Sequence, residues 1–347
     1  MSEWTSRVRV GTASWSEPEF VRAGWYPPGL AAGRQLAYYA RQFDLVELNS
    51  SFYALPQPRQ SERWAAETPP GFLFDAKVHR LLSRHATRPD ALPADLRGQV
   101  EVSERGHVIL TPMLEAELAG RLLEALKPLE KAGKLGALLL QLTPSFAPRA
   151  CGPEQLEGLL RLLRGRGQSP RQVVVELRHR GWLEGARRAE TTAFFQEQGV
   201  ALASIDGPSA DEQKHATIMP VVDEAANERL AYLRLHGRNP KAYLTGKTVA
   251  ERFHYDYNDA ELDEVLARTE RLARASDAVH VVFNNNARDF APKAAERLRR
   301  RLGQTAGPAA PAPAPLPAAS PVRAARSARA SAACGPAVGK LTQGLLF

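Results

Sequence analysis

The chain has 347 residues, with 46 Lys and Arg against 38 Asp and Glu, so its formal net charge is +8. Four of those positive charges and no acid lie in residues 307–347, which leaves only +4 for residues 1–306 and argues against a dedicated nucleic-acid surface. Two cysteines exclude a disulfide scaffold and a cysteine-built metal site, and no apolar run reaches membrane-spanning length, so we expect a cytoplasmic protein.

Short apolar runs rich in β-branched residues alternate with helical patterns along residues 1–306. We predict strands at Val8–Thr12, Leu45–Asn49, Leu73–Lys77, Leu135–Leu142, Gln172–Leu177, Ala201–Ile205, Ala231–Leu235 and Val279–Phe283. Leucines spaced three and four apart predict a helix over 114–129 and another from Gly152-Pro153 to Leu163, and Asn258-Asp259 caps a third. Strands that alternate with helices pair in parallel. The predicted fold is α/β, a single (β/α)8 TIM-type barrel with long strand-to-helix loops; a doubly wound open sheet is the alternative.

Residues 307–347 form a second region of different composition. Pro, Ala, Ser and Arg dominate it, and such a segment buries too little apolar surface to offset the entropy of ordering. We therefore predict a barrel over 1–306 and a disordered, basic tail over 307–347, for which the sequence names no partner.

Loop lengths indicate which end of the barrel carries function. The connections from helix to strand are short, whereas the stretches expected to lead from strand to helix at 13–34, 78–112, 206–230 and 236–258 are long. Long loops are usually functional, and in a barrel they gather at the carboxyl ends of the strands, where active sites lie.

Charged residues are expected inside the barrel at that end. Strand alternation places Glu47 with Asn49, Glu176 with Arg178, and Arg234 with His236 on the interior face. A buried charge must be paired or functional, so these residues are either a catalytic group or a structural ion-pair layer. The sequence leaves both interpretations open.

Further polar and aromatic residues are predicted at the same rim. We expect the substrate-binding residues to be Trp15, Asn49, Tyr53, Lys77, Gln141, Arg178, Asp206, Arg234, Arg238, Asn284 and Asn285. Arginine and lysine suit an anion, amides suit hydroxyl groups, and Trp15 and Tyr53 could stack on a sugar ring.

The histidines show no paired spacing of the kind that binds metal. We therefore predict no metal or other cofactor. A divalent metal held by Glu176, His179, Asp206 and His236 after folding is the alternative.

Several motifs together resemble one family. The stretches 10–15, 46–53, 141–146, 175–182, 206–208, 232–239 and 283–286 resemble, in order, the DUF72 or YecE-like family. The resemblance runs from about Val8 to Leu302 and implies a (β/α)8 barrel, but the family has no established reaction. Ala13-Ser14-Trp15 stands where the family more commonly has Ser-Gly-Trp. The family's likeness to endonuclease IV-type barrels implies a DNA-processing alternative.

Three functions follow from these residues. We favour a metal-independent enzyme, a hydrolase or lyase, with Glu47, Glu176 and His236 as catalytic acid and base candidates for a small anionic or sugar-like ligand. The first alternative is a metal-dependent phosphodiesterase or endonuclease IV-like enzyme acting on nucleic acid, which the charge of +4 does not favour. The second is a binding or scaffold protein that uses the tail.

Overall fold

A computed structural model describes residues 3–165, 169–209, 215–224 and 226–304. The predicted tail, 307–347, lies outside the described residues. No helix within the described ranges is both long enough and apolar enough to cross a membrane.

Eight parallel strands close into a barrel in the order of the sequence, with β8 pairing back onto β1. Their bounds are β1 Val8–Ala13, β2 Leu45–Leu48, β3 Leu73–Lys77, β4 Leu135–Gln141, β5 Gln172–Glu176, β6 Ala201–Asp206, β7 Ala231–Leu235 and β8 Val279–Phe283. Every strand lies where the sequence predicts it, and closure rules out the open sheet.

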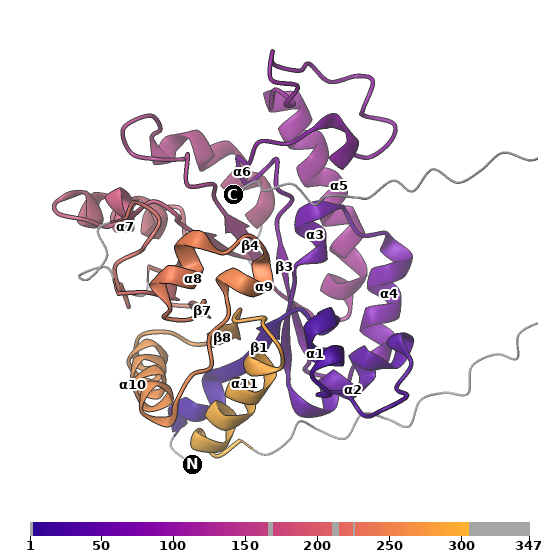
Figure 1. Cartoon of the computed structure of the whole chain (residues 1–347). Coiled ribbons are helices and arrows are strands. Elements are labelled where there is room, and N and C mark those ends of the chain that lie inside the picture. Colours follow the sequence, from indigo (N-terminus) through magenta and orange to yellow (C-terminus); the bar gives the residue numbers. More distant parts are fainter. Residues whose placement is uncertain (1–2, 166–168, 210–214, 225, 305–347) are drawn as a thin grey trace, which may run out of the picture.

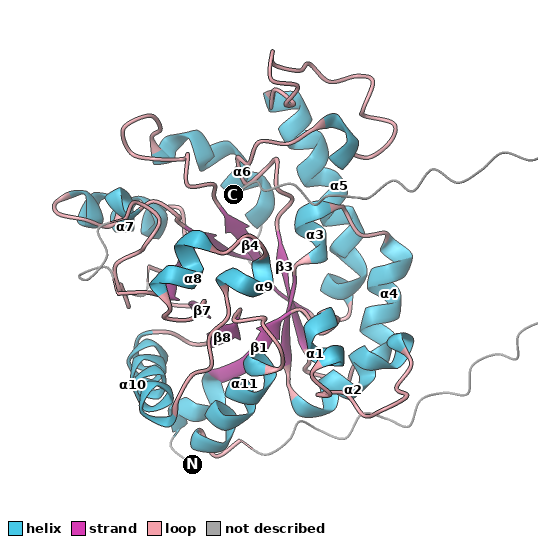
Figure 2. Ribbon diagram, viewed as in Figure 1, coloured by secondary structure: helices cyan, strands magenta, loops and turns pink. Residues whose placement is uncertain are grey.

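Helices surround the strands, as Figure 2 shows in cyan around magenta. The helices are α1 Pro18–Arg22, α2 Gln35–Gln42, α3 Ser50–Tyr53, α4 Pro58–Glu67, α5 Pro112–Lys131, α6 Glu157–Arg164, α7 Arg187–Glu197, α8 Pro240–Thr245, α9 Val249–Arg252, α10 Asp259–Ala275 and α11 Phe290–Arg301. The three helices predicted from leucine spacing and capping are present as α5, α6 and α10. The long helices α4 and α5 pack side by side, and α10 packs against α11 (Figure 1).

Two apolar layers hold the barrel together. The outward-facing strand residues pack on the helices, with Val10, Val46 and Phe74 among them. A smaller interior cluster includes Leu45, Leu139, Val174 and Val282. The interior is therefore packed with side chains, as in other barrels of this size.

One predicted connection is wrong. We expected residues 206–230 to lead from a strand to a helix, but no helix occurs among the described residues between β6 and β7. Pro208 and Pro220 interrupt this stretch, and it has no apolar repeat with helical spacing. Arg268 of α10 instead binds Asp223 of the crossover with nitrogen–oxygen distances of 2.8–3.1 Å.

Candidate active site

Charged and polar residues gather at the carboxyl ends of strands β2, β3, β4, β5 and β7. Five of them end or nearly end a strand, and two follow a strand end by one or two residues. We call them the mouth cluster: Glu47, Lys77, Gln141, Glu176, Arg178, Arg234 and His236.

Arg234 is the centre of the mouth cluster. Its guanidinium is fully buried and holds Glu47 with two hydrogen bonds, from Nε at 3.0 Å and Nη2 at 2.7 Å. The remaining nitrogen, Nη1, donates to Glu176. One arginine thus bridges two carboxylates that are 129 positions apart in the sequence.

Glu47 is fully committed to this network. Besides the two bonds from Arg234, its Oε2 accepts a hydrogen bond of 3.1 Å from the hydroxyl of Tyr232. Glu47 is completely buried. Both of its oxygens are therefore occupied, which suits a residue that positions Arg234 better than one that exchanges protons.

Glu176 accepts hydrogen bonds from several elements. Gln141 donates at 2.8 Å and Arg178 at 3.1 Å to Oε1, while Arg234 occupies Oε2. Burial would raise the pKa of Glu176, but the positive charges of Arg234 and Arg178 outweigh that effect and hold the pKa well below its usual range. Glu176 is therefore ionised at neutral pH.

His236 lies between Glu176 and β8. Its Nδ1 lies 2.9 Å from the Asn284 amide nitrogen, which donates, so Nε2 carries the proton of the neutral ring. Nε2 lies 3.3 Å from Glu176 Oε1, but it has no hydrogen-bond partner in the described part of the chain. Burial lowers the pKa of His236 to about 4 although Glu176 opposes the shift. The ring therefore presents an N–H donor that a ligand oxygen could occupy.

Lys77 and Arg178 are the cations of the mouth cluster that retain some exposed surface. Arg178 also donates to the Tyr243 hydroxyl at 2.8 Å, and its side chain is 12% exposed. Lys77 is half-buried, and its ammonium nitrogen lies 4.3 Å from the centre of the Phe52 ring. Desolvation by burial, assisted by Arg234, lowers the pKa of Lys77 to about 7.

Amide oxygens without partners lie at the ends of neighbouring strands. Asn49 follows β2, and Asn285 and Asn286 follow β8. Their Oδ1 atoms are buried and have no hydrogen-bond partner among the described residues. Unpaired buried acceptors are costly, and hydroxyl groups of a ligand would satisfy them.

Asp206 and Arg238 lie in a different network from the one predicted. Arg238 holds Asp206 with hydrogen bonds of 3.0 and 2.9 Å, and Asp206 also accepts from Arg268 of α10 at 2.8 Å and from Tyr257 at 2.7 Å. The partners lie on the helix side of β6, so these bonds fasten the helix-free crossover to α10. The prediction that Asp206 and Arg238 bind substrate has no support in this geometry.

The two predicted aromatic contacts also differ. Trp15 packs edge-on against Trp64 of α4 and Phe74 of β3, with ring centres 5.7 and 6.3 Å apart, so it belongs to the apolar layer under the helices. Tyr53 is 56% exposed and rests edge-on against Phe52 beside Lys77. Of the two, only Tyr53 is largely exposed.

The four residues of the alternative metal site do not converge. Glu176 and His236 are adjacent, Asp206 belongs to the network with α10, and His179 Nδ1 accepts from the amide of Gly181 at 3.2 Å. No group of three or more His, Cys, Asp or Glu within the described ranges is arranged to hold a metal ion.

Tyr232 and Tyr243 contact the mouth cluster without having been predicted as site residues, through Glu47 and Arg178 respectively. Strand alternation could have found Tyr232, because it shares a face with Arg234. Tyr243 lies on α8, and nothing in its local sequence shows that it reaches Arg178.

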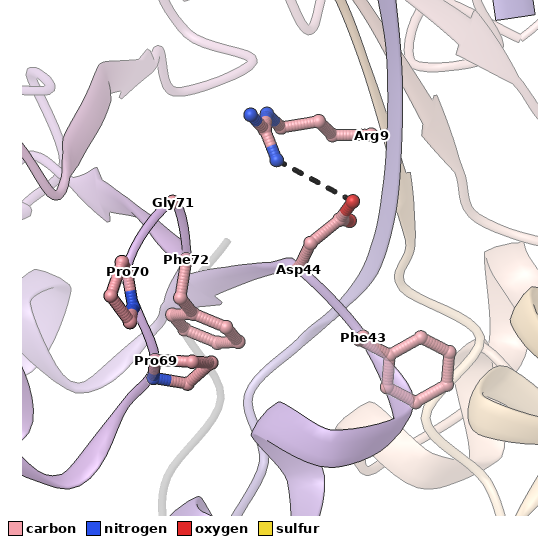
Figure 3. Close-up of a pocket in the computed structure, with 7 residues that line it drawn as sticks. All are labelled: Arg9, Phe43, Asp44, Pro69, Pro70, Gly71 and Phe72. Carbon is pink, nitrogen blue, oxygen red and sulfur yellow. Dashed lines mark ion pairs between the residues drawn. The ribbon is translucent and has the colours of Figure 1, made fainter. Parts of the chain in front are cut away.

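A small pocket lies at the opposite end of the barrel. Arg9, Asp44 and the turn at 69–72 line it at the amino ends of β1, β2 and β3, and Arg9 pairs with Asp44 at 3.4 Å (Figure 3). Residues at this end of a barrel generally serve stability.

The closed parallel barrel with a charged mouth at its carboxyl end places the protein among the (β/α)8 barrels. The family model described as "Protein of unknown function DUF72" matches residues 9–319, and the chain belongs to that family. The match extends past the predicted boundary at residue 306.

Relatives and solved structures agree with this assignment. The chain is 28% identical over 284 residues to the UPF0759 protein YunF of Bacillus subtilis, covering 81% of this chain and 89% of YunF. It is 35% identical to YecE of Escherichia coli K12 over 79 residues, 23% of this chain and 26% of YecE. A DUF72 family protein of Thermotoga maritima superposes with a TM-score of 0.65 at 25% identity, over 86% of this chain and 99% of that one. One from Enterococcus faecalis V583 gives 0.66 at 22% identity, over 86% and 96%.

Proposed function

We propose that this protein is an enzyme that performs metal-independent acid–base chemistry on a small polyhydroxylated or anionic substrate at the mouth cluster. The observation that carries the proposal is the pair of Glu176 and His236, an ionised carboxylate beside a neutral imidazole whose N–H has no partner in the described chain. Groups held in different protonation states in one site are typical of catalytic centres.

The surroundings define the kind of substrate. Arg178 offers positive charge to a phosphate or carboxylate, and the unpaired oxygens of Asn49, Asn285 and Asn286 accept from hydroxyl groups. A sugar phosphate or sugar acid combines both features.

The roles within the pair follow from its geometry. The neutral His236 Nε2–H would donate a hydrogen bond to a substrate oxygen on which negative charge develops. Glu176 would stabilise positive charge near that ring, and Glu47 would act indirectly by fixing Arg234. This assignment changes Glu47 from a proton-transfer group to a positioning residue.

A ligand screen followed by a turnover assay tests the proposal. Sugar phosphates, sugar acids and uncharged sugars are first compared for the shift each produces in the melting temperature. Each ligand that binds is then incubated with the wild type, Glu176→Gln and His236→Asn, and product is followed by NMR. The control is Glu115→Gln. Glu115 lies on α5, and the substitution removes the carboxylate that pairs with Arg84.

We expect both mouth variants to lose turnover by about 10²–10⁴-fold while Glu115→Gln retains it. Glu176→Gln should still fold for two reasons. Its amide oxygen can accept from Gln141 and Arg178. Arg234 also keeps both of its hydrogen bonds to Glu47. Full turnover in both mouth variants would contradict the proposal, and an unfolded Glu176→Gln would assign that carboxylate to structure.

A further inference from the structure

We propose that Lys77 is the nucleophile of this site and forms an imine with the carbonyl carbon of a polyhydroxylated aldehyde or ketone. The inference deepens the proposed function, on which it rests, by naming the substrate's reactive group and the residue that attacks it. It also changes the predicted role of Lys77 from binding an anion to covalent chemistry.

The position of Lys77 fits this role. It is the last residue of β3, at the end of the barrel where catalytic residues lie, and it remains partly accessible. Its neighbours in the mouth come from β2, β5 and β7 and surround it with fixed groups. A rigid strand end holds a nucleophile in place better than a loop does.

The carboxylates near Lys77 are already used. Glu47 is bound by Arg234 and Tyr232, and Glu176 by Arg234, Arg178 and Gln141. Within the described residues, the ammonium of Lys77 makes no ion pair and contacts the Phe52 ring instead. A lysine whose acidic neighbours are taken by arginines lacks the partner that would keep it protonated.

The balance of charge favours the neutral amine. Glu47 and Glu176 supply two negative charges, which Arg234 and Arg178 neutralise, so a proton on Lys77 leaves the cluster with one excess positive charge. Desolvation and then the arginines lower the pKa of Lys77 to about 7, against the opposing effect of the two carboxylates. Near neutral pH its neutral fraction is on the order of a thousandfold larger than that of an ordinary lysine. Amine nucleophiles in enzymes are activated in this way.

The step is balanced without an added oxidant or metal. The Nζ lone pair attacks the carbonyl carbon, and the carbonyl oxygen becomes a hydroxyl by taking up a proton. The hydroxyl then takes up a second proton and leaves as water while nitrogen forms the double bond to carbon, so the two protons that the amine loses balance the two in the water. The His236 Nε2–H, which has no hydrogen-bond partner among the described residues, is a donor that could polarise that oxygen.

Reductive trapping tests the proposal on the full-length protein. The protein is incubated near neutral pH with glycolaldehyde, the smallest hydroxyaldehyde, and sodium cyanoborohydride, which reduces an imine to a stable hydroxyethyl amine. Peptide mapping by mass spectrometry then measures the labelling of each lysine over time. Lys241, exposed on α8, is the internal reference.

We expect Lys77 to be labelled at least about tenfold faster than Lys241, because its neutral fraction is larger. The label at position 77 should be absent from Lys77→Met and present in Lys241→Met. A competing sugar phosphate that binds the mouth should slow labelling at Lys77 and leave Lys241 unchanged. Labelling of Lys77 no faster than that of Lys241 would overturn the proposal.

The outcome is separable from that of the proposed function. If Lys77 is not labelled preferentially but turnover still depends on Glu176 and His236, the acid–base function stands and the imine is overturned. If Lys77 is labelled preferentially but both mouth variants keep full turnover, the imine stands and the acid–base assignment fails.

Discussion

Arg234 determines the positions of both carboxylates in the mouth cluster. It is buried with no exposed surface and bridges Glu47 and Glu176, so the geometry of both carboxylates depends on it. Forming a buried ion pair costs free energy because both charges lose their hydration. Removing one partner is strongly destabilising because it leaves the other charge buried without a counter-charge.

Replacing Arg234 by Met should therefore lower the free energy of unfolding by about 3–5 kcal/mol, because two buried carboxylates lose their counter-charge. Urea unfolding followed by circular dichroism measures the loss. Arg121→Met on α5, which removes solvent-exposed pairs with Asp95 and Glu117, should cost less than about 1 kcal/mol. Equal losses of unfolding free energy in the two variants would mean that the ion pairs of Arg234 with Glu47 and Glu176 stabilise the fold no more than a solvent-exposed pair does.

His236 gives the fold a dependence on pH. Its folded pKa of about 4 lies below the ordinary value of 6.5, so the unfolded chain binds the proton first as the pH falls. The stabilisation is complete above about pH 6.5 and is lost as the pH falls toward about 4. His79, whose pKa burial also lowers to about 4, contributes in the same window.

His236→Asn should reduce the loss of stability over that window by up to about 3 kcal/mol, with the His79 contribution remaining. The measurement is urea unfolding at a series of pH values for the wild type and the variant. If the free energy of unfolding falls equally with pH in the wild type and the variant, His236 is not held neutral in the folded protein.

Ser14 occupies a conformation that favours glycine. Its φ is +84°, directly after β1. Ser14→Gly should be more stable than Ser14→Ala by about 1 kcal/mol, since both lose the hydrogen bond from the Ser16 amide to the serine hydroxyl but only Ala keeps the strained Cβ. Thermal unfolding of the two variants decides this, and a more stable Ala variant would contradict it.

At the residue scale, the sequence predicted which charges face inward but not their pairing. Alternation along three strands placed Glu47, Glu176, Arg234 and His236 inside, and all four are buried there. It could not show that Arg234 takes both carboxylates and leaves Lys77 without one, because that depends on side-chain reach across the barrel. The pairing of Asp206 with Arg268 was not predicted, because Arg268 lies 62 positions away on α10.

Among the elements, α10 shows how local sequence specifies a boundary. Asn258 accepts a hydrogen bond of 3.0 Å from the Glu261 amide, and Glu261 accepts one of 2.9 Å from the Asn258 amide. The cap was predictable from Asn258-Asp259 because those groups act within one helical turn.

Asn258→Ala should cost about 1 kcal/mol, since it leaves an amide at the start of α10 without its partner. Asn258→Asp, which keeps an acceptor oxygen, is the matched variant and should remain close to the wild type. Chemical unfolding of the three proteins tests this, and an unchanged Ala variant would show that the cap is dispensable.

The strands were predictable for a similar reason, because short β-branched runs are local and barrel strands are buried on both faces. The crossover from β6 to β7 was not. A helix was expected there by analogy with the other connections, whereas ion pairs from α10 hold it instead.

At the scale of the whole molecule, the closed barrel brings the carboxyl ends of five strands together, and the mouth cluster lies there. The proposed function requires that this cluster be catalytic. The family establishes the fold and leaves the reaction open. Fold-level reasoning was therefore sufficient for the architecture, and the chemistry has to be argued from Glu176, His236 and Lys77.

The most direct measurement is product formation by metal-stripped protein from a sugar phosphate or sugar acid that binds the mouth, comparing the wild type with Glu176→Gln. We predict that the stripped wild type turns the ligand over and that the folded variant is slower by about 10²–10⁴-fold. Turnover that requires an added divalent metal, or a folded variant with the full rate, would contradict the account.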